Sequence, residues 1–449
     1  MTSEVAVLNR TGIALATDSA VTVRAPMGKA KLYQADKLFM LSNTQPVGVM
    51  VYSSASLLGV PWEVILKLFR ANLGNSKLPN LEDYATKLWK FVDDSKHLFP
   101  PAEQQRSYLH LVDVFFRRLA GSVSALNDAH IKNTDIEKKK SLLHFQIEVV
   151  TAELILWQAK VDSGTFNMAT ANKYSGLASV KRTDLVLKHF PGANDKLTNA
   201  LNELTKLIIT KAEIAQDSQS GIVIAGYGES NVFPVMQEFH VGEIYDDKLK
   251  YRHVKTWQIS NDDRSVVKPF AQSDMVQTFL SGLSPKVERK QGREIREALV
   301  LASKAAIDGF PGVSKRRKNA YKEQILASSL AAAETIQKRV LDHSVKEHYS
   351  QVLEFVTHLP KHELAHVASS LVNLNSFQKR MNFRDDETVG GPIDVAVISK
   401  CDGFVWVARK HYFTRELNSH YFRNRSQLWP NNAAEVMSLE ATRNESRQG

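Results

Sequence analysis

The start of the chain is the stretch that most constrains the fold. Two short apolar segments are separated by Asn9-Arg10-Thr11-Gly12, in which the glycine favours a tight turn. We therefore predict an antiparallel hairpin that folds about the Arg10–Thr11 bond. This register places Thr2 opposite Ser19 and Ser3 opposite Asp18. It brings a carboxylate within side-chain reach of the beginning of the chain.

A threonine at this position suggests nucleophilic chemistry. A small residue after Met1 normally permits removal of the methionine, and we expect the mature chain to begin with Thr2. The free α-amine, with a pKa of about 7.7–8.0, can accept the hydroxyl proton and return it. A lysine would favour the neutral amine by like-charge repulsion, and an aspartate would orient that lysine. Asp18 and Lys37 supply these two residue types.

This pattern resembles the N-terminal-nucleophile hydrolases of the proteasome β-subunit type. In that family a threonine opens the first strand, an aspartate closes the second, and a lysine precedes an apolar strand, here at 37–41, with the next strand at 47–51. The resemblance implies hydrolysis of amide or peptide bonds without a cofactor or metal. It also implies that the N–H of Ser53 forms the oxyanion hole, where the family carries glycine. Lys29 and Lys31 compete with Lys37 for the lysine position.

A second similar stretch lies near the other end of the chain. The loop 386–391 and the apolar segments around Cys401-Asp402-Gly403 resemble the closing loop and hairpin of the same family. The resemblance implies that Asp386 braces the terminal threonine. Val389 stands where the family has a serine, which leaves a non-catalytic scaffold as an alternative to an active enzyme. Residues 221–228 resemble the central strand of the family and its turn.

The resemblance implies an α+β fold, a four-layer αββα sandwich of two antiparallel sheets between helices. The expected core comprises 1–75 and 217–410, and 411–449 is a polar, basic tail. Residues 76–216 show helical periodicity and are expected to form a helical insertion. Covering the active-site cleft, assembly and binding of a protein partner all stay open as its role. A homo-oligomer is also possible, since family members often form rings.

A literal H-E-x-x-H motif offers a competing hypothesis. On a helix, His362 and His366 would present two imidazoles to Zn²⁺, with Glu363 as general base. Glu387 lies where a third ligand could be placed, and the chain would then be a zinc metallopeptidase. Pro360 instead puts the motif in the first turn of its helix, where Glu363 would favourably meet the helix N-terminus. We favour this second interpretation.

Composition limits the remaining function classes. The net charge is +10, but basic residues are scattered, and clusters such as 138–140 and 315–318 are not interleaved with aromatic residues. Nucleic acid is therefore not the expected partner. No apolar run approaches the roughly 18–20 residues that cross a bilayer, so no membrane partner is expected. Cys401 is the single cysteine and cannot form an intrachain disulfide, which predicts a cytoplasmic location.

Overall fold

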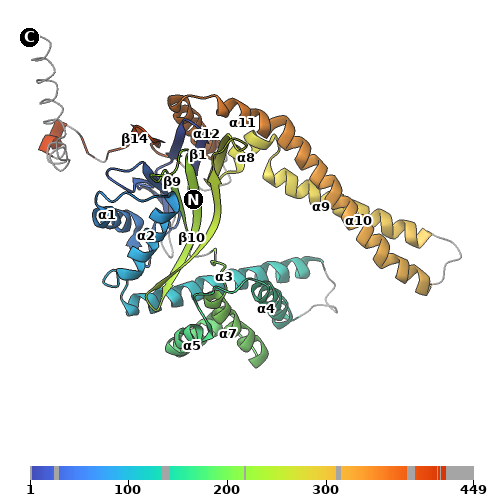
Figure 1. Ribbon diagram of the computed structural model, residues 1–449. Coiled ribbons are helices and arrows are strands. Elements are labelled where there is room, and N and C mark those ends of the chain that lie inside the picture. Colours follow the sequence, from blue (N-terminus) through green and yellow to red (C-terminus); the bar gives the residue numbers. More distant parts are fainter. Residues whose placement is uncertain are drawn as a thin grey trace, which may run out of the picture. The chain divides into compact units, whose positions relative to one another are not determined.

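A computed structural model describes residues 3–24, 30–133, 141–216, 219–309, 315–381, 390–411, 413–414 and 416–420. The chain divides into two compact units, 1–408 and 409–449. The second unit contributes a short 3-10 helix, Glu416–Asn418, to the described part. The described residues of the first unit combine helices with antiparallel sheets, as the sequence predicts at this level (Figure 1).

Two five-stranded antiparallel sheets dominate the unit. The first has the order β12-β1-β2-β13-β14, and the second has the order β11-β10-β9-β6-β5. The strands of the first sheet are β1 (Ser3–Asn9), β2 (Gly12–Thr17), β12 (Ser265–Ala271), β13 (Asp394–Ser399) and β14 (Gly403–Ala408). Those of the second are β5 (Leu38–Met40), β6 (Val47–Ser53), β9 (Ser220–Gly226), β10 (Val235–Tyr245) and β11 (Lys248–Gln258). Two small hairpins are β3 (Ala20–Arg24) with β4 (Ala30–Gln34), and β7 (Ser56–Leu57) with β8 (Val60–Pro61).

The first hairpin has the predicted register. Glu4 pairs with Thr17 and Asn9 with Gly12 across β1 and β2. A side chain at position 12 does not fit, because a Cβ there would lie 2.7 Å from the carbonyl oxygen of Ile398. The side-chain amide of Asn9 anchors this turn by donating to the carbonyls of Val356 and Leu359, each at 2.8 Å.

Alternating side chains of the strands face different cores. Leu8 of β1, Met50 of β6 and Val223 of β9 belong to one buried cluster, to which both sheets contribute. Val5 and the other residues of the opposite β1 face pack with helix α12. The outer residues of β6 and β9, such as Val49, pack with α1 and α2. The strands are therefore covered on both faces, as their nearly continuous apolar sequences predict.

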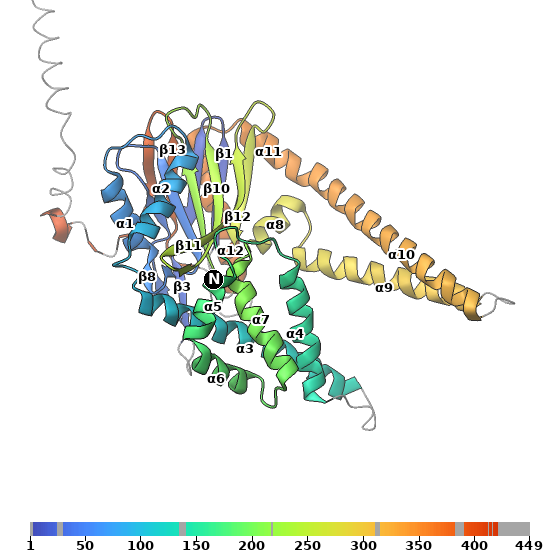
Figure 2. The same ribbon diagram turned by 60° about the horizontal axis from the view of Figure 1, so that its bottom comes forward.

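The helices fall into three groups (Figures 1 and 2). Those packed on the sheets are α1 (Trp62–Leu73), α2 (Leu81–Asp94), α8 (Asp274–Ser281), α11 (Ser350–Thr357) and α12 (Lys361–Met381). A second group comprises α3 (Pro101–Asn133), α4 (Leu142–Gln158), α5 (Met168–Leu177), α6 (Ser179–His189) and α7 (Asp195–Thr210). The third is the pair α9 (Pro285–Gly309) and α10 (Lys315–Ser344), which pack along each other and are followed by a π-helical turn, Val345–Tyr349.

The second group has a hydrophobic core of its own. Phe115, Phe116 and Leu204 are among its fully buried residues, and Tyr245 at the end of β10 joins the same cluster. Helix α2, which lies inside the expected insertion 76–216, packs instead with α1 on the second sheet. The insertion as a domain stays a prediction. None of the described helices is both long and apolar enough to cross a membrane.

Candidate active site

Asp18 is the centre of the site. It follows β2, is fully buried, and accepts hydrogen bonds from three donors that are far apart in the sequence. Its Oδ1 accepts from Lys37 Nζ at 2.7 Å and from the backbone N–H of Ser3 at 3.0 Å. Its Oδ2 accepts from the N–H of Gly390 at 3.1 Å. A buried carboxylate needs such donors, because an unpaired charge in the interior is very costly.

Lys37 completes a buried ion pair with this carboxylate. Its side chain is 4% exposed, and its Nζ also donates to the carbonyl of Ala20 at 2.6 Å. Lys37 immediately precedes β5, and its own carbonyl accepts from Val51 of β6 at 2.9 Å, so the second sheet fixes its backbone. The structure thus brings together Asp18 and Lys37. The competing Lys29 and the side chain of Lys31 lie outside the described part.

Ser3 lies where the described chain begins, and a buried asparagine holds it. Asn375 of α12 donates its side-chain N–H groups to Ser3 Oγ at 2.7 Å and to the carbonyl of Gln272 at 2.9 Å. One amide therefore joins α12, β1 and the segment that follows β12. Sequence reasoning missed Asn375. Its position on the buried helix face, three or four residues after Leu371 and Val372, is the signal that could have identified it.

The loop before β13 approaches the same site. The Ser19 N–H donates to the carbonyl of Gly390 at 3.3 Å, and its hydroxyl donates to the carbonyl of Pro392. This contact confirms that the 390–392 segment lies beside the end of β2. Thr2, Asp386, Val389 and Glu387 fall outside the described residues, so their predicted roles stay predictions.

Ser53 ends β6 in a left-handed backbone conformation, with φ of 66°. Glycine adopts this conformation without strain, whereas another residue loses roughly 1–2 kcal/mol. Serine at position 53, in place of the glycine that the resemblance described above implies, therefore makes the backbone conformation less favourable. Ala271, the strand partner of Ser3, also has a positive φ of 55°. Two unfavourable backbone conformations thus lie at the ends of β6 and β12, one strand from each sheet, and such strain commonly accompanies function.

A cavity of about 920 Å³ opens beside these residues. Ser53, Ala271 and Gln272 line it on one side, and residues of α3 line it on the other. Its size falls within the range of about 300–1,000 Å³ that is typical of small-ligand sites. Because Ala271 pairs with Ser3, the cavity lies next to the point where β1 begins.

The H-E-x-x-H motif lies elsewhere. It begins α12, and His362 and His366 are both exposed. Within the described ranges, no group of three or more His, Cys, Asp or Glu side chains is placed to hold a metal ion. The carboxylate of Glu363 lies 3.6 Å from the Nε2 of His362, its sequence neighbour.

Comparison with known proteins gives little support for a family. No protein-family model and no curated protein matches the chain. Similar solved structures include Anbu (ancestral beta-subunit) from Yersinia bercovieri, with 9% identity, a TM-score of 0.26, and coverage of 96% of this chain and 97% of that one. Another is the Anbu complex from Pseudomonas aeruginosa, described as a helical assembly, with 10% identity, a TM-score of 0.26, and coverage of 97% and 95%. Anbu from Hyphomicrobium sp. strain MC1 has 10% identity, a TM-score of 0.25, and coverage of 97% of both chains.

These findings correct one conclusion of the sequence analysis. The assignment to N-terminal-nucleophile hydrolases of the proteasome β-subunit type was wrong, because the similar structures are Anbu proteins and no family model supports that assignment. At such low TM-scores the likeness to Anbu itself carries no argument about site or activity. The physical reason for the error is that each matched motif has only a few residues, and short patterns recur by chance in a chain of 449 residues.

Proposed function

We propose that this chain hydrolyses amide or peptide bonds with Thr2 as nucleophile, after removal of Met1. The observation that carries the proposal is the buried ion pair of Asp18 and Lys37. One oxygen of Asp18 accepts both from Lys37 Nζ and from the N–H of Ser3, the residue directly after Thr2. The charge of a buried lysine this close to Ser3 suits the activation of a terminal amine at Thr2.

In the proposed reaction, Thr2 Oγ attacks the substrate carbonyl carbon while its hydroxyl proton moves to the α-amine of the same residue. The amine then passes this proton to the leaving nitrogen, the C–N bond breaks, and an acyl-enzyme forms. Water attacks the acyl carbon while the amine takes one of its protons. The ester bond to Thr2 Oγ then breaks, the amine returns the proton to Oγ, and the acid product leaves. Lys37 favours the neutral amine by repulsion, and Asp18 holds Lys37 in place.

The backbone around the site would stabilise the charge that develops. We assign the oxyanion hole to the N–H of Ser53, which ends β6 beside the cavity. Asp386 is proposed to brace the terminal residue. The cavity is the proposed substrate site, because Ser53 and Ala271 both line it.

The wider setting follows from the same proposal. We interpret the two sheets and the helices that pack on their outer residues as the four-layer αββα arrangement. A cytoplasmic location stays a prediction that rests on Cys401 being the single cysteine of the chain. A homo-oligomer stays a prediction.

The test is an intact-mass spectrum after treatment with an epoxyketone or β-lactone. We expect loss of Met1 and a single adduct, mapped to Thr2. Thr2→Ala should remain folded and form no adduct, whereas Thr2→Ser should form it slowly. Ser328→Ala is the matched control, because this serine lies on α10 outside the cavity and its hydroxyl donates only to Gln324 of the same helix, and it should label normally. Retained Met1, or full activity of Thr2→Ala, would refute the mechanism. Met1 loss without an adduct would favour the non-catalytic scaffold.

A further inference from the structure

One face of α3 forms a wall of the cavity. The lining residues on this helix recur at intervals of three and four, which places them on one side of it. They are Glu103, Arg106, Ser107, His110, Leu111 and Val114. At a rise of 1.5 Å per residue, the eleven steps from the first to the last span roughly 16 Å. The cavity is therefore elongated along α3, and we call it the trench. Its α3 wall changes from polar to apolar along the helix.

The rest of the lining comes mainly from the core. It includes Ser53, the loop that follows it up to Gly59, and the end of β12 at Ala271. The proposed oxyanion donor and the point where β1 begins thus lie on this side. A substrate held between the two walls would touch both the reacting groups and α3.

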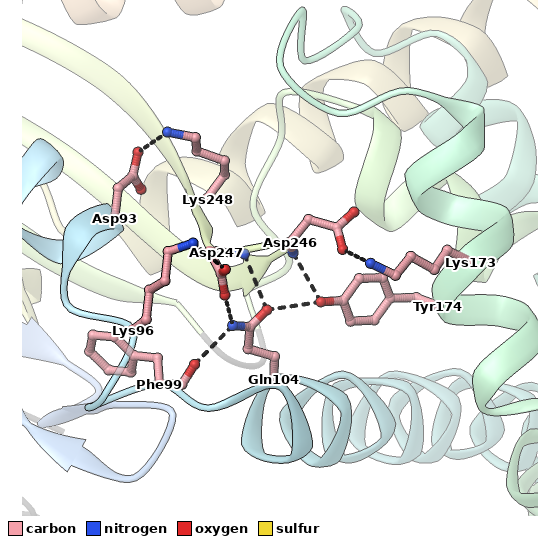
Figure 3. Close-up of polar contacts among 9 residues, drawn as sticks. All are labelled: Asp93, Lys96, Phe99, Gln104, Lys173, Tyr174, Asp246, Asp247 and Lys248. Atoms are coloured by element: carbon pink, nitrogen blue, oxygen red, sulfur yellow. Dashed lines mark hydrogen bonds and ion pairs between the residues drawn. The ribbon is translucent and has the colours of Figure 1, made fainter.

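Helix α3 is fixed against the second sheet at its first turn (Figure 3). Gln104 donates to Asp247 Oδ1 and to the carbonyl of Phe99, both at 2.8 Å, and accepts from the Tyr174 hydroxyl at 2.9 Å. The same hydroxyl also accepts from the N–H of Asp246 at 3.0 Å. Asp246 and Asp247 form the turn between β10 and β11, so Gln104 binds α3 directly to that hairpin.

Further contacts support this attachment. Lys96 forms an ion pair with Asp247 at 2.9 Å, and Lys173 of α5 forms one with Asp246. Three residues beyond Gln104, the Ser107 hydroxyl donates to Glu243 of β10. The wall is therefore held in place before any substrate binds, and such preorganisation lowers the cost of binding.

We propose that α3 is the outer wall of the substrate site and that the trench binds about five residues of an extended peptide. This inference rests on the proposed hydrolase function. An extended chain advances roughly 3.3 Å per residue, so about five residues fill 16 Å. Arg106 and Glu103 pair on the rim at 2.9 Å with the arginine side chain 76% exposed. Exposed pairs contribute little, so both side chains can exchange this contact for substrate groups of either charge.

The experiment uses epoxyketone probes that carry peptides of one to six residues. We expect the second-order labelling rate to rise with length up to about five residues and then to level off. His110→Trp places an indole in the trench and should lower the ratio of the five-residue rate to the one-residue rate at least tenfold. Arg106→Trp is a second variant of the same kind at an exposed position. Ala125→Trp, on an exposed part of α3 outside the cavity, is the matched control and should keep the wild-type ratio.

A binding measurement separates this inference from the proposed chemistry. In the Thr2→Ala background, a fluorescent five-residue peptide should bind at least tenfold more weakly when His110→Trp is added. If no probe labels the wild type but the peptide still binds in this way, the hydrolase fails and the trench stands. Labelling that does not depend on probe length, or a ratio that His110→Trp leaves unchanged, would overturn the trench.

Discussion

Lys250 carries the most quantitative prediction, because burial leaves its amine in an unfavourable environment. The side chain is 4% exposed on β11, and its Nζ donates to the carbonyl of Ile208 near the end of α7. Burial lowers the pKa of this amine from 10.5 to about 7, and the nearby Glu213 only partly opposes the shift. Lys250→Met removes the titratable group but keeps a long apolar side chain.

The sign of the effect follows from proton linkage. Between pH 7 and 10.5, the unfolded chain binds a proton at this lysine that the folded chain does not bind. The free energy of unfolding of the wild type therefore rises with pH across this window. At about 1.36 kcal/mol per pKa unit, the cost of keeping Lys250 neutral in the folded state is on the order of 4 kcal/mol at pH 7 and about 1 kcal/mol at pH 10. Below pH 7 Lys250 is charged in both states, and the free-energy cost of burying it levels off at its maximum.

The substitution removes this cost but also the hydrogen bond to Ile208. An unsatisfied buried carbonyl costs about 1–3 kcal/mol. We therefore expect Lys250→Met to be more stable than the wild type by on the order of 2 kcal/mol at pH 7. At pH 10 the order should reverse, with the variant less stable by about 1 kcal/mol.

The assay is equilibrium urea unfolding, followed by circular dichroism, at one-unit steps from pH 6 to pH 10. Lys248→Met is the matched control, because Lys248 lies two residues earlier on the same strand, is exposed, and pairs with Asp93 at the surface. Its difference from the wild type should not rise or fall by more than a few tenths of a kcal/mol over this range. If the difference between Lys250→Met and the wild type is equally flat, Lys250 titrates normally and the reasoning is refuted.

Two further substitutions test the packing and the site. Gly221→Ala should lower the free energy of unfolding by several kcal/mol, because the new Cβ would lie 2.0 Å from the Tyr52 ring. Its control, Gly121→Ala in open space on α3, should raise the free energy of unfolding by roughly 0.5–1 kcal/mol. Equal melting temperatures of the two variants would contradict the close packing of the ring. Asn375→Ala should slow labelling of the N-terminal residue at least fivefold and shift the pH profile of labelling. Its control, Ser376→Ala, loses only a hydrogen bond within its own helix and should do neither. Equal effects of the two substitutions would show that Asn375 has a merely structural role.

Local sequence signals lead to Asp18 and Lys37, which the structure places in contact, whereas the catalytic roles of these residues stay predictions. The turn at Asn9–Gly12 fixes the register of β1 and β2, and this register alone places Asp18 beside Ser3. Lys37 was identified because it precedes an apolar strand, and the structure places it on Asp18. Both inferences span fewer than about forty residues and depend on hairpin geometry, which short patterns encode directly.

Other features depend on contacts that no local pattern encodes. Asn375 reaches Ser3 across 372 positions, so its role appears only after α12 has packed on the first sheet. The sequence of α3 alone does not show which of its faces lines a cavity.

Substitutions around Asp18 and substitutions on the cavity face of α3 should have different effects on reactivity and stability. This carboxylate joins Ser3 of the first sheet, Lys37 at the edge of the second, and Gly390 of the loop before β13. A substitution there leaves a buried lysine without its counter-charge, and chemistry and stability should fall together. The cavity face of α3 contributes nothing to the ion pair, and Ser107 joins it to β10 through Glu243. Substitutions along it should therefore change which peptides react, while the reactivity of the terminal residue toward small electrophiles continues to depend on Asp18.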